Sequence, residues 1–282
     1  MTPPRMSEPL RPGLYIVATP IGNLGDLSPR AADTLARASL ILAEDKRVSA
    51  RLVAGVEPRP PMRTYNDHSD EADRAAIVAR LGEEAIALVS DAGTPLISDP
   101  GYKLVRDARA AGHEVVTIPG PCAAVAALTL AGLPTDRFLF LGFLPPKEKA
   151  RADAIAEVAA VRATLVLYES GPRLAASLKA LADGLGDRDA AVARELTKMH
   201  EECRTGSLGQ LAARYGEAPP RGEIVIVIAP PAPPEAASAD QLDEALRQAM
   251  LTESPSRAAA TVAQQLGIKR KLVYERALQL AK

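Results

Sequence analysis

AIALVSDAGTPLISDPG, residues 85–101, joins an uninterrupted apolar run to a loop built largely of Gly, Pro, Asp and Ser. The run Ala85–Ser90 predicts a β-strand buried on both faces, because a half-solvated strand would alternate apolar and polar residues. Such strands are typical of parallel sheets that are covered by helices on both sides. The loop begins where the strand ends, and open parallel sheets bind ligands at this edge.

The sequence around this stretch alternates short apolar runs with helical patterns. We predict further strands over Leu14–Ala18, Leu40–Ala43 and Val115–Ile118, and helices over Pro29–Ala38, Ser69–Leu81 and Tyr102–Ala111. This alternation indicates a parallel sheet with helices on its faces. We therefore expect one α/β domain over residues 13–121.

Beyond Gly120 the spacing of the patterns changes. We predict helices over Ala123–Ala131, Lys149–Ala160 and Pro172–Leu181, and strands over Phe138–Phe143, Thr164–Tyr168, Ala190–Arg194 and Ile224–Ala229. These elements indicate a second α/β domain over residues 122–229. The expected fold class is therefore α/β, with two domains.

The end of the chain differs from both domains in composition. Residues 230–237, PPAPPEAA, are typical of a proline-rich linker. Residues 238–282 form a basic tail, in which six basic against two acidic residues from position 251 onward give +4. Gly267 marks the turn of a helix–turn–helix pattern, with a solvated helical pair that caps the fold as the alternative. The helical stretches of this tail are Ala239–Met250, Ser256–Gln265 and Lys269–Ala281.

The bulk composition narrows the class of protein. Hydrophobic residues make up 47% of the 282 residues, and the net charge of −1 means that any RNA contact needs a local basic patch. Cys122 and Cys203 are too far apart for a CxxC metal motif, so we expect no metal and no disulfide framework. No signal-peptide segment occurs, and no run approaches the roughly 20 apolar residues of a membrane span. We expect a cytoplasmic protein without membrane contact.

Four unusual loops follow the predicted strands of the first domain, at residues 18–28, 44–47, 90–101 and 119–122. The carboxyl ends of parallel strands meet at one edge of a sheet, so these loops predict a ligand cleft. Their glycines allow the backbone to approach a ligand closely. Asp91 and Asp99 flank the longest loop, where a carboxylate could accept a ribose hydroxyl or lie near a cationic ligand centre. Ordinary turn chemistry is the alternative, because Asp, Gly and Pro also dominate β-turns. The motifs of P-loop NTPases, dinucleotide-binding folds and α/β-hydrolases are absent from the sequence.

Seven stretches spread over residues 13–229 together resemble the tetrapyrrole-methylase superfamily. They are VATPIGNLGDLSPRA, ILAEDKR, SDAGTPLISDPG, IPGPCAAVAALTLAGLP, LYESGPRL, RELTKMHEE and GEIVIVI. Within the superfamily they are similar to the branch that 2′-O-methylates a cytidine ribose of 16S ribosomal RNA in the small ribosomal subunit. The resemblance implies two α/β domains with S-adenosylmethionine in the cleft between them, and a homodimer.

The resemblance also implies which residues contact the cofactor. Tyr168 would lie against the adenine, with a role as a core aromatic between the domains as the alternative. The implied cofactor-binding residues are Thr19, Pro20, Asp91, Ala92, Gly93, Leu96, Ile97, Pro119, Ala126, Thr129, Tyr168, Leu196, Glu223 and Ile224.

One stretch departs from the family pattern. AEDKRVSARL has Lys46 and Ser49 where the family has threonines, so any role for these two positions is in doubt. Arg47 and Arg51 remain one helical turn apart, which allows both to face an RNA phosphate. In the basic tail, Lys269, Arg270 and Lys271 are the further RNA-binding candidates.

Methyl transfer to a hydroxyl needs a group that accepts its proton. Our hypothesis favours Glu44 and Asp45, which end a predicted strand beside two arginines, while an ion-pair cluster is the alternative role. Glu169 and His200 are further candidates, and His68 lies in a polar loop that could border the substrate.

Three other functions compete with RNA methylation. A tetrapyrrole methyltransferase would share the cofactor loops, and a related enzyme could act on a modified protein side chain. A non-enzymatic RNA-binding assembly factor would use only the basic tail. Calorimetry with S-adenosylmethionine separates this last function from the others, because an absence of binding would leave only the non-enzymatic role.

Overall fold

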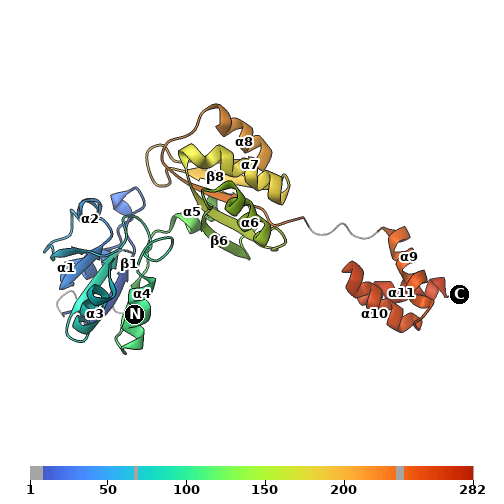
Figure 1. Cartoon of the computed structure of the whole chain (residues 1–282), viewed down its shortest axis with the longest axis horizontal. Coiled ribbons are helices and arrows are strands. Elements are labelled where there is room, and N and C mark those ends of the chain that lie inside the picture. Colours follow the sequence, from blue (N-terminus) through green and yellow to red (C-terminus); the bar gives the residue numbers. More distant parts are fainter. Residues whose placement is uncertain (1–8, 67–68, 233–237, 282) are drawn as a thin grey trace. The chain divides into compact units, whose positions relative to one another are not determined.

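A computed structural model describes residues 9–66, 69–232 and 238–281 of the chain. The chain divides into two compact units, Met1–Pro230 and Pro231–Lys282. The first unit contains two five-stranded sheets, and the second is helical (Figure 1). No helix in the described part of the chain is long and apolar enough to cross a membrane.

The first sheet is entirely parallel, as the sequence predicts, and its strand order is β3-β2-β4-β1-β5. The apolar strand β4 lies inside the sheet, paired with β1 and β2, and all five of its residues are buried. The five strands are β1 (Gly13–Val17), β2 (Leu40–Ala43), β3 (Met62–Thr64), β4 (Ala85–Val89) and β5 (Val115–Ile118).

Helices cover both faces of this sheet, so its strands bury side chains in two directions. Leu35 of α1 packs with Ala87 and Val89 on one face, and Leu104 of α4 packs with Ile86 and Leu88 on the other. The alternation of β4 side chains between the two faces follows from the pleat of a strand. The helices of this half are α1 (Pro29–Arg37), α2 (Lys46–Leu52), α3 (Glu71–Arg80) and α4 (Tyr102–Ala110), with a short 3₁₀ helix η1 (Leu24–Asp26).

The second sheet is mixed, with the order β6-β7-β10-β8-β9. Its strands β6 and β7 run parallel, whereas the β7–β10, β10–β8 and β8–β9 pairs are antiparallel. The carboxyl ends of β6, β7 and β8 therefore share an edge with the amino end of β10. The strands are β6 (Phe138–Phe143), β7 (Thr164–Ser170), β8 (Asp189–Arg194), β9 (Glu202–Ser207) and β10 (Glu223–Ile228).

Different helices cover the two faces of the second sheet. Leu178 of α7 and Leu211 of α8 pack with the strands on one face, whereas Leu128 of α5 packs with them on the other. Ile21 lies in the loop after β1, yet it belongs to the core beneath α5. This side chain ties the first half of the unit to the second. The helices are α5 (Ala123–Leu130), α6 (Glu148–Val158), η2 (Gly171–Arg173), α7 (Leu174–Leu185) and α8 (Leu208–Glu217).

Helices α2 and α8 and strands β3 and β9 of the first unit are absent from the sequence prediction, as is the short helix η1. β9 reads ECRTGS and is at most half-buried, so it lacks the apolar run that identifies a strand. β3 has only three residues, and its pairing with β2 defines it. The helix predicted to start at Pro172 begins with the 3₁₀ turn η2, and α7 continues to Leu185.

The second unit is a small helical bundle. Its helices are α9 (Ala239–Met250), α10 (Pro255–Leu266) and α11 (Arg270–Leu280). Gly267 ends α10 in the left-handed conformation (φ 64°), which confirms the turn predicted at this position. Arg276 of α11 donates to both carboxylate oxygens of Asp243 in α9, at 2.7 and 2.6 Å. This two-point pair and a core around Leu246 and Val262 hold the three helices together.

Candidate functional site

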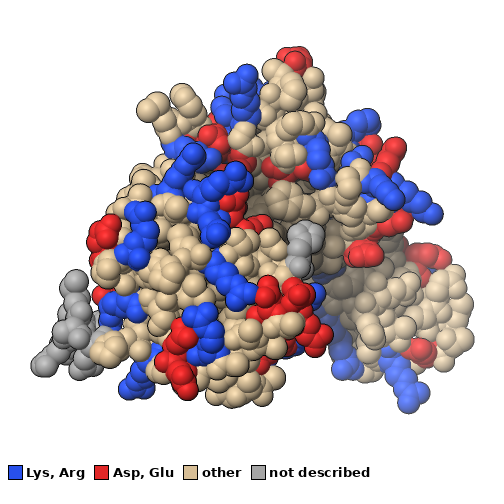
Figure 2. Space-filling model, turned by 60° about the vertical axis from the view of Figure 1, so that its left-hand side comes forward, with Lys and Arg blue, Asp and Glu red and all other residues tan. Residues whose placement is uncertain are grey.

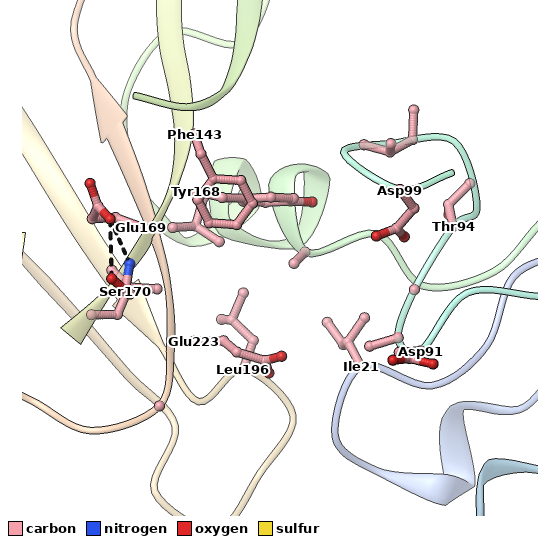
Figure 3. Close-up of a pocket in the computed structure, with 17 residues that line it drawn as sticks. Ile21, Asp91, Thr94, Asp99, Phe143, Tyr168, Glu169, Ser170, Leu196 and Glu223 are labelled. Atoms are coloured by element: carbon pink, nitrogen blue, oxygen red, sulfur yellow. Dashed lines mark hydrogen bonds between the residues drawn. The ribbon is translucent and has the colours of Figure 1, made fainter. Parts of the chain in front are cut away.

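A cavity of about 380 Å³ lies where the carboxyl edge of the first sheet meets the edge of the second sheet formed by β6, β7, β8 and β10 (Figure 3). Its volume falls in the ordinary range of small-molecule sites. From the first half it is lined by Ile21, Asp91, Ala92, Gly93, Thr94, Ile97 and Asp99. From the second half it is lined by Ala123, Phe143, Tyr168, Glu169, Ser170, Leu196, Gly222, Glu223, Ile224 and Val225.

Two backbone hydrogen bonds join the loops after β1 and β4 beside the cavity. Thr19 and Gly93 form an isolated antiparallel bridge, in which the Thr19 amide donates to the Gly93 carbonyl at 2.8 Å and the Gly93 amide donates back at 3.1 Å. Gly93 has a φ of +79°, which L side chains rarely adopt. An added Cβ would also lie 3.1 Å from Ile21. Glycine is therefore needed for the loop to keep this shape.

The middle of the β4 loop is strained. Leu96 and Ser98 adopt the left-handed conformation, with φ of 74° and 65°. Such residues cost about 1–3 kcal/mol each and gather at ligand sites, where the surrounding structure imposes them. Thr94 anchors the loop, because its hydroxyl donates to the Pro121 carbonyl at 2.9 Å. The strained segment thus presents Ile97 and Asp99 to the cavity in one defined shape.

Two carboxylates, Asp91 and Asp99, lie on the first-half wall of the cavity. Asp91 accepts a hydrogen bond from the Asp45 amide at 3.0 Å. Burial is the main reason that the pKa of Asp99 rises to about 6, and the negative charge of Asp91 adds to it, against a hydrogen bond from Ser90. Asp99 can therefore take up or release a proton close to neutral pH.

The opposite wall is aromatic. Tyr168 lies at the end of β7, and the ring centroids of Phe140 and Phe143 are 4.9 and 5.7 Å from its own, edge to face. The Tyr168 hydroxyl accepts a hydrogen bond from the Ala124 amide at 3.2 Å, in the first turn of α5. Burial raises the pKa of Tyr168, so the hydroxyl stays protonated and the aromatic surface carries no charge.

The edge of this wall is a rigid polar turn after β8. Glu195 and Thr197 are left-handed (φ 50° and 64°) and flank Leu196, whose buried side chain lines the cavity. Lys198 bridges Glu195 at 3.1 Å and Glu223 at 3.0 Å, which ties this turn to the start of β10.

Gly222, just before β10, has a φ of +96° and lies against the Glu195 carboxylate, where any Cβ would collide. Glu169 follows Tyr168 and is held below the surface. Its carboxylate accepts from the Ser177 hydroxyl at 2.5 Å and from the Ser170 amide at 2.8 Å, and it pairs with Arg173 at 3.4 Å. These contacts position the end of β7 and stabilise the buried charge.

The structure brings eight of the predicted cofactor-binding residues to the cavity. They are Asp91, Ala92, Gly93, Ile97, Tyr168, Leu196, Glu223 and Ile224. The other six are outside its described lining: Thr19, Pro20, Leu96, Pro119, Ala126 and Thr129. Thr19 and Pro20 are buried in the loop after β1, which is hydrogen-bonded to the loop after β4. Pro119 and Thr129 are exposed. A cofactor contact for each of these residues stays a prediction.

Glu44 and Asp45 are outside the described lining of the cavity. Asp45 caps α2 by accepting from the Arg47 amide at 2.8 Å, and it pairs with the Arg47 guanidinium at 3.2 Å. The Arg47 contacts lower the pKa of Asp45, which makes it a weaker base. The ion-pair role set against the base hypothesis is thus visible, while the catalytic role stays a prediction. His200 is exposed, and His68 lies outside the described residues.

The RNA-binding candidates are on the surface. Arg47 and Arg51 are exposed on α2, as is Lys46, whereas Ser49 is fully buried. Ser49 thus faces the interior and Lys46 faces solvent. Figure 2 shows Lys and Arg side chains gathered in a band on the face drawn, so the small net charge hides an uneven distribution. In the second unit, exposed basic side chains surround the start of α11: Lys269, Arg270 and Lys271.

Several lining residues escape prediction from the sequence, among them Ile21, Thr94 and Phe143, and Glu169 is predicted only as a candidate base. Asp99 is predicted together with Asp91 as a loop carboxylate for a ligand. Asp99 lies near the end of the loop after β4, but it is not among the contacts that the family resemblance implies. No motif in the sequence indicates that Phe143 lines the site. It lies on the edge strand of the second sheet, and the pairing of β6 with β7 brings it to the cavity.

Comparison with known proteins gives consistent matches. The family model for Tetrapyrrole (Corrin/Porphyrin) Methylases matches residues 13–212, and that for the RsmI C-terminal HTH domain matches residues 235–281. The chain is 55% identical to "Ribosomal RNA small subunit methyltransferase I" of Erythrobacter litoralis, over 97% of each chain. It is 46% identical to the protein of the same name in Mesorhizobium japonicum, over 97% of this chain and 94% of the relative.

A solved structure has the same fold. It is uroporphyrin-III C-methyl transferase from Thermus thermophilus complexed with S-adenyl homocysteine, with a TM-score of 0.53. The likeness covers 77% of this chain and 97% of that chain. The identity is 20%, so the likeness extends to the fold alone.

Proposed function

The chain belongs to the tetrapyrrole (corrin/porphyrin) methylase family, and on that premise we propose that it methylates 16S ribosomal RNA. The methyl donor is S-adenosylmethionine, and the acceptor is the 2′-hydroxyl of a cytidine in the small ribosomal subunit. The observation that carries the proposal is the match to ribosomal RNA methyltransferases over nearly the full length. The match includes the helix–turn–helix tail, which has its own family model.

The cavity fits this methyl donor. Its aromatic and apolar wall around Tyr168 and Leu196 suits the flat adenine, and Asp91 and Asp99 suit a positively charged sulfonium. Gly93 and Gly222 are both at positive φ, so their backbones can approach a ligand closely. When bound, S-adenosylmethionine supplies an activated methyl group.

The residues of the chain contribute alignment and proton acceptance. The rigid loops hold the donor and the ribose in one geometry, and such alignment can supply up to about 7–11 kcal/mol of the lowered barrier. Of the carboxylates that line the cavity, Asp99 has a pKa of about 6. Asp99 is ionised at neutral pH, and its pKa lies near the operating pH, which favours proton acceptance. The pKa of Asp45 is lowered by Arg47, so Asp99 is the better candidate for the base.

RNA phosphates are bound by basic side chains in both units. Removal of charge lowers RNA affinity and the steepness of its salt dependence, by about 0.7–0.9 in log–log slope for each phosphate that is no longer bound. Alanine variants at these positions test this role, and Lys179→Ala is a control, because Lys179 is an exposed lysine paired with Asp183 on α7. The positions are Arg47, Arg51, Lys269, Arg270 and Lys271.

The family resemblance supports two further features of the proposal. The protein acts as a homodimer, and it works in the cytoplasm, where ribosomal subunits are assembled. Sedimentation of the purified protein measures the first feature. A monomer at micromolar concentration would contradict it.

The function is tested by incubation of the protein and S-adenosylmethionine with small ribosomal subunits from cells that lack it. Mass mapping of the 16S RNA is expected to find one new methyl group, on a cytidine ribose. A methyl group on the base, or none at all, would contradict the proposal. Transfer to a tetrapyrrole instead would support the competing function, and failure to bind S-adenyl homocysteine would leave only an assembly factor.

A further inference from the structure

Aromatic side chains are scarce in this protein and unevenly placed. The chain has three Phe and no Trp, and all three Phe residues are on the edge strand β6. Phe140 is half-buried beneath α5, whereas Phe138 and Phe143 are 48% and 55% exposed. Of these two exposed rings, only Phe143 is in the described lining of the cavity.

A break in β6 directs Phe143 toward the cavity. Residues 140 and 143 would point to opposite faces of a regular strand, because side chains alternate with a period of two. The register against β7 shifts between them, and Gly142 is left-handed there, with φ of 64°. As a result both rings contact Tyr168. Bulges of this kind re-aim side chains next to ligand sites.

The bulge is also fitted to the opposite wall. A Cβ at Gly142 would lie 3.2 Å from the hydroxyl oxygen of Ser98, which belongs to the strained loop after β4. The bulge in β6 and the strained loop after β4 therefore meet beside the cavity. The Phe143 ring itself is held by its edge-to-face contact with Tyr168.

The exposure of the ring separates Phe143 from the residues that line the interior. Ile21 and Leu196 are 8% and 6% exposed and Ile97 is 38% exposed, whereas Phe143, at 55%, is the most exposed of the large apolar side chains in the described lining. A ligand enclosed by the cavity would cover the first two. A ring that is more than half exposed has surface available for a second molecule at the mouth.

We propose that Phe143 is a stacking platform for the unpaired target base of the RNA. The inference rests on the proposed function, because the RNA is its substrate. Proteins that recognise single-stranded RNA stack splayed bases on aromatic side chains, and enzymes that modify nucleotides take the target out of its stack. A base on Phe143 brings its own ribose to the mouth of the cavity, where the methyl group is transferred.

The test compares Phe143→Ala with Phe138→Ala, which removes an equally exposed ring from the same strand. We expect Phe143→Ala to lower kcat/KM on small ribosomal subunits by about tenfold to a hundredfold, the range of one lost base stack. Phe138→Ala should stay within about twofold of wild type, since surface substitutions have small effects. Phe143→Trp should retain activity, and Phe143→Leu should not, because stacking needs a flat ring.

Calorimetry measures the affinity of each variant for S-adenyl homocysteine alongside the kinetics. Because binding needs an intact cavity, it also shows that each variant is folded. Each Phe143 variant should lose much less affinity for this ligand than Phe143→Ala loses in kcat/KM, and Phe138→Ala should bind it with wild-type affinity. Equal kinetics of Phe143→Ala and Phe138→Ala would overturn the inference and leave the proposed function intact. A loss of S-adenyl homocysteine affinity as large as the loss of kcat/KM would also overturn it, because Phe143 would then serve the cofactor. A wild-type protein that binds this ligand but methylates no RNA would overturn both.

Discussion

The two sheets of the first unit contribute to the cavity in opposite ways. The first sheet is parallel, and it supplies a polar loop after β4 with two carboxylates and several left-handed residues. The second sheet is mixed, and it supplies the aromatic and apolar side chains of Tyr168, Phe143 and Leu196. It also supplies two carboxylates, Glu169 and Glu223, each of which is held in an ion pair. Because Arg173 and Lys198 neutralise the carboxylates of the second wall, that wall works through its flat apolar surface, whereas the first wall works through backbone shape and charge.

The largest expected effect concerns the charge of the first wall. Asp99→Asn removes the proposed proton acceptor, and the loss of a positioned base lowers kcat by about 10²–10⁴-fold. The affinity for S-adenyl homocysteine should change much less. In the wild type, kcat should fall as the pH is lowered through about 6, the pKa of Asp99, because the carboxylate must be ionised to act. A variant with wild-type kcat would show that the base lies elsewhere.

The next effect concerns the backbone of the same wall. Gly93→Ala forces a side chain into φ +79° beside Ile21, and Gly112→Ala forces one into φ +80° where no described atom lies within 4 Å. The backbone strain of about 1–2 kcal/mol is common to both. Only Gly93→Ala displaces the loop, and a small misplacement can cost about a hundredfold in methyl transfer. Equal losses in both variants would mean that strain alone, and not the cavity, explains the effect.

The first wall is easier to predict from the sequence than the second, for a physical reason. Carboxyl ends of parallel strands always share an edge, so the loop at Asp91 and Gly93 can be assigned to a ligand site from the pattern alone. In the second sheet the edge joins the end of β7 to the start of β10, and only the antiparallel register places Glu223 opposite Ser170. The residues there are predicted only through the family resemblance. Phe143 depends on a bulge, so neither the pattern nor the resemblance identifies it.

A smaller effect sharpens the role of the second wall. Tyr168→Phe keeps the flat ring but leaves the amide of Ala124, a 3% exposed residue, without the hydroxyl that accepts its hydrogen bond. The free energy of unfolding should fall by about 1–3 kcal/mol, the cost of a buried group without a partner. Tyr102→Phe is the control, because that side chain is 68% exposed. Denaturant unfolding that gave equal stabilities would contradict the capping role.

The smallest effect is on stability and has a defined sign. The pKa of Asp99 in the folded state is raised to about 6 from the ordinary value of 3.8. The protonated side chain therefore makes its full contribution to the free energy of unfolding below pH 3.8, and this contribution is lost as the pH rises through 6. Asp99→Asn should therefore melt slightly higher than wild type at pH 8 and show no such gain near pH 4. Because the side chain is partly exposed, solvent screening keeps the gain below about 1 kcal/mol. Thermal melts of both proteins over this pH range measure it.

The central claim is that both walls hold one ligand, the methyl donor. A crystal structure of the protein with S-adenyl homocysteine tests this most directly. We expect the ligand between the backbone of Ala92 and Gly93 on one side and Tyr168 and Leu196 on the other, with Phe143 still open to solvent. A ligand bound to one wall alone, or outside the cavity, would contradict the claim.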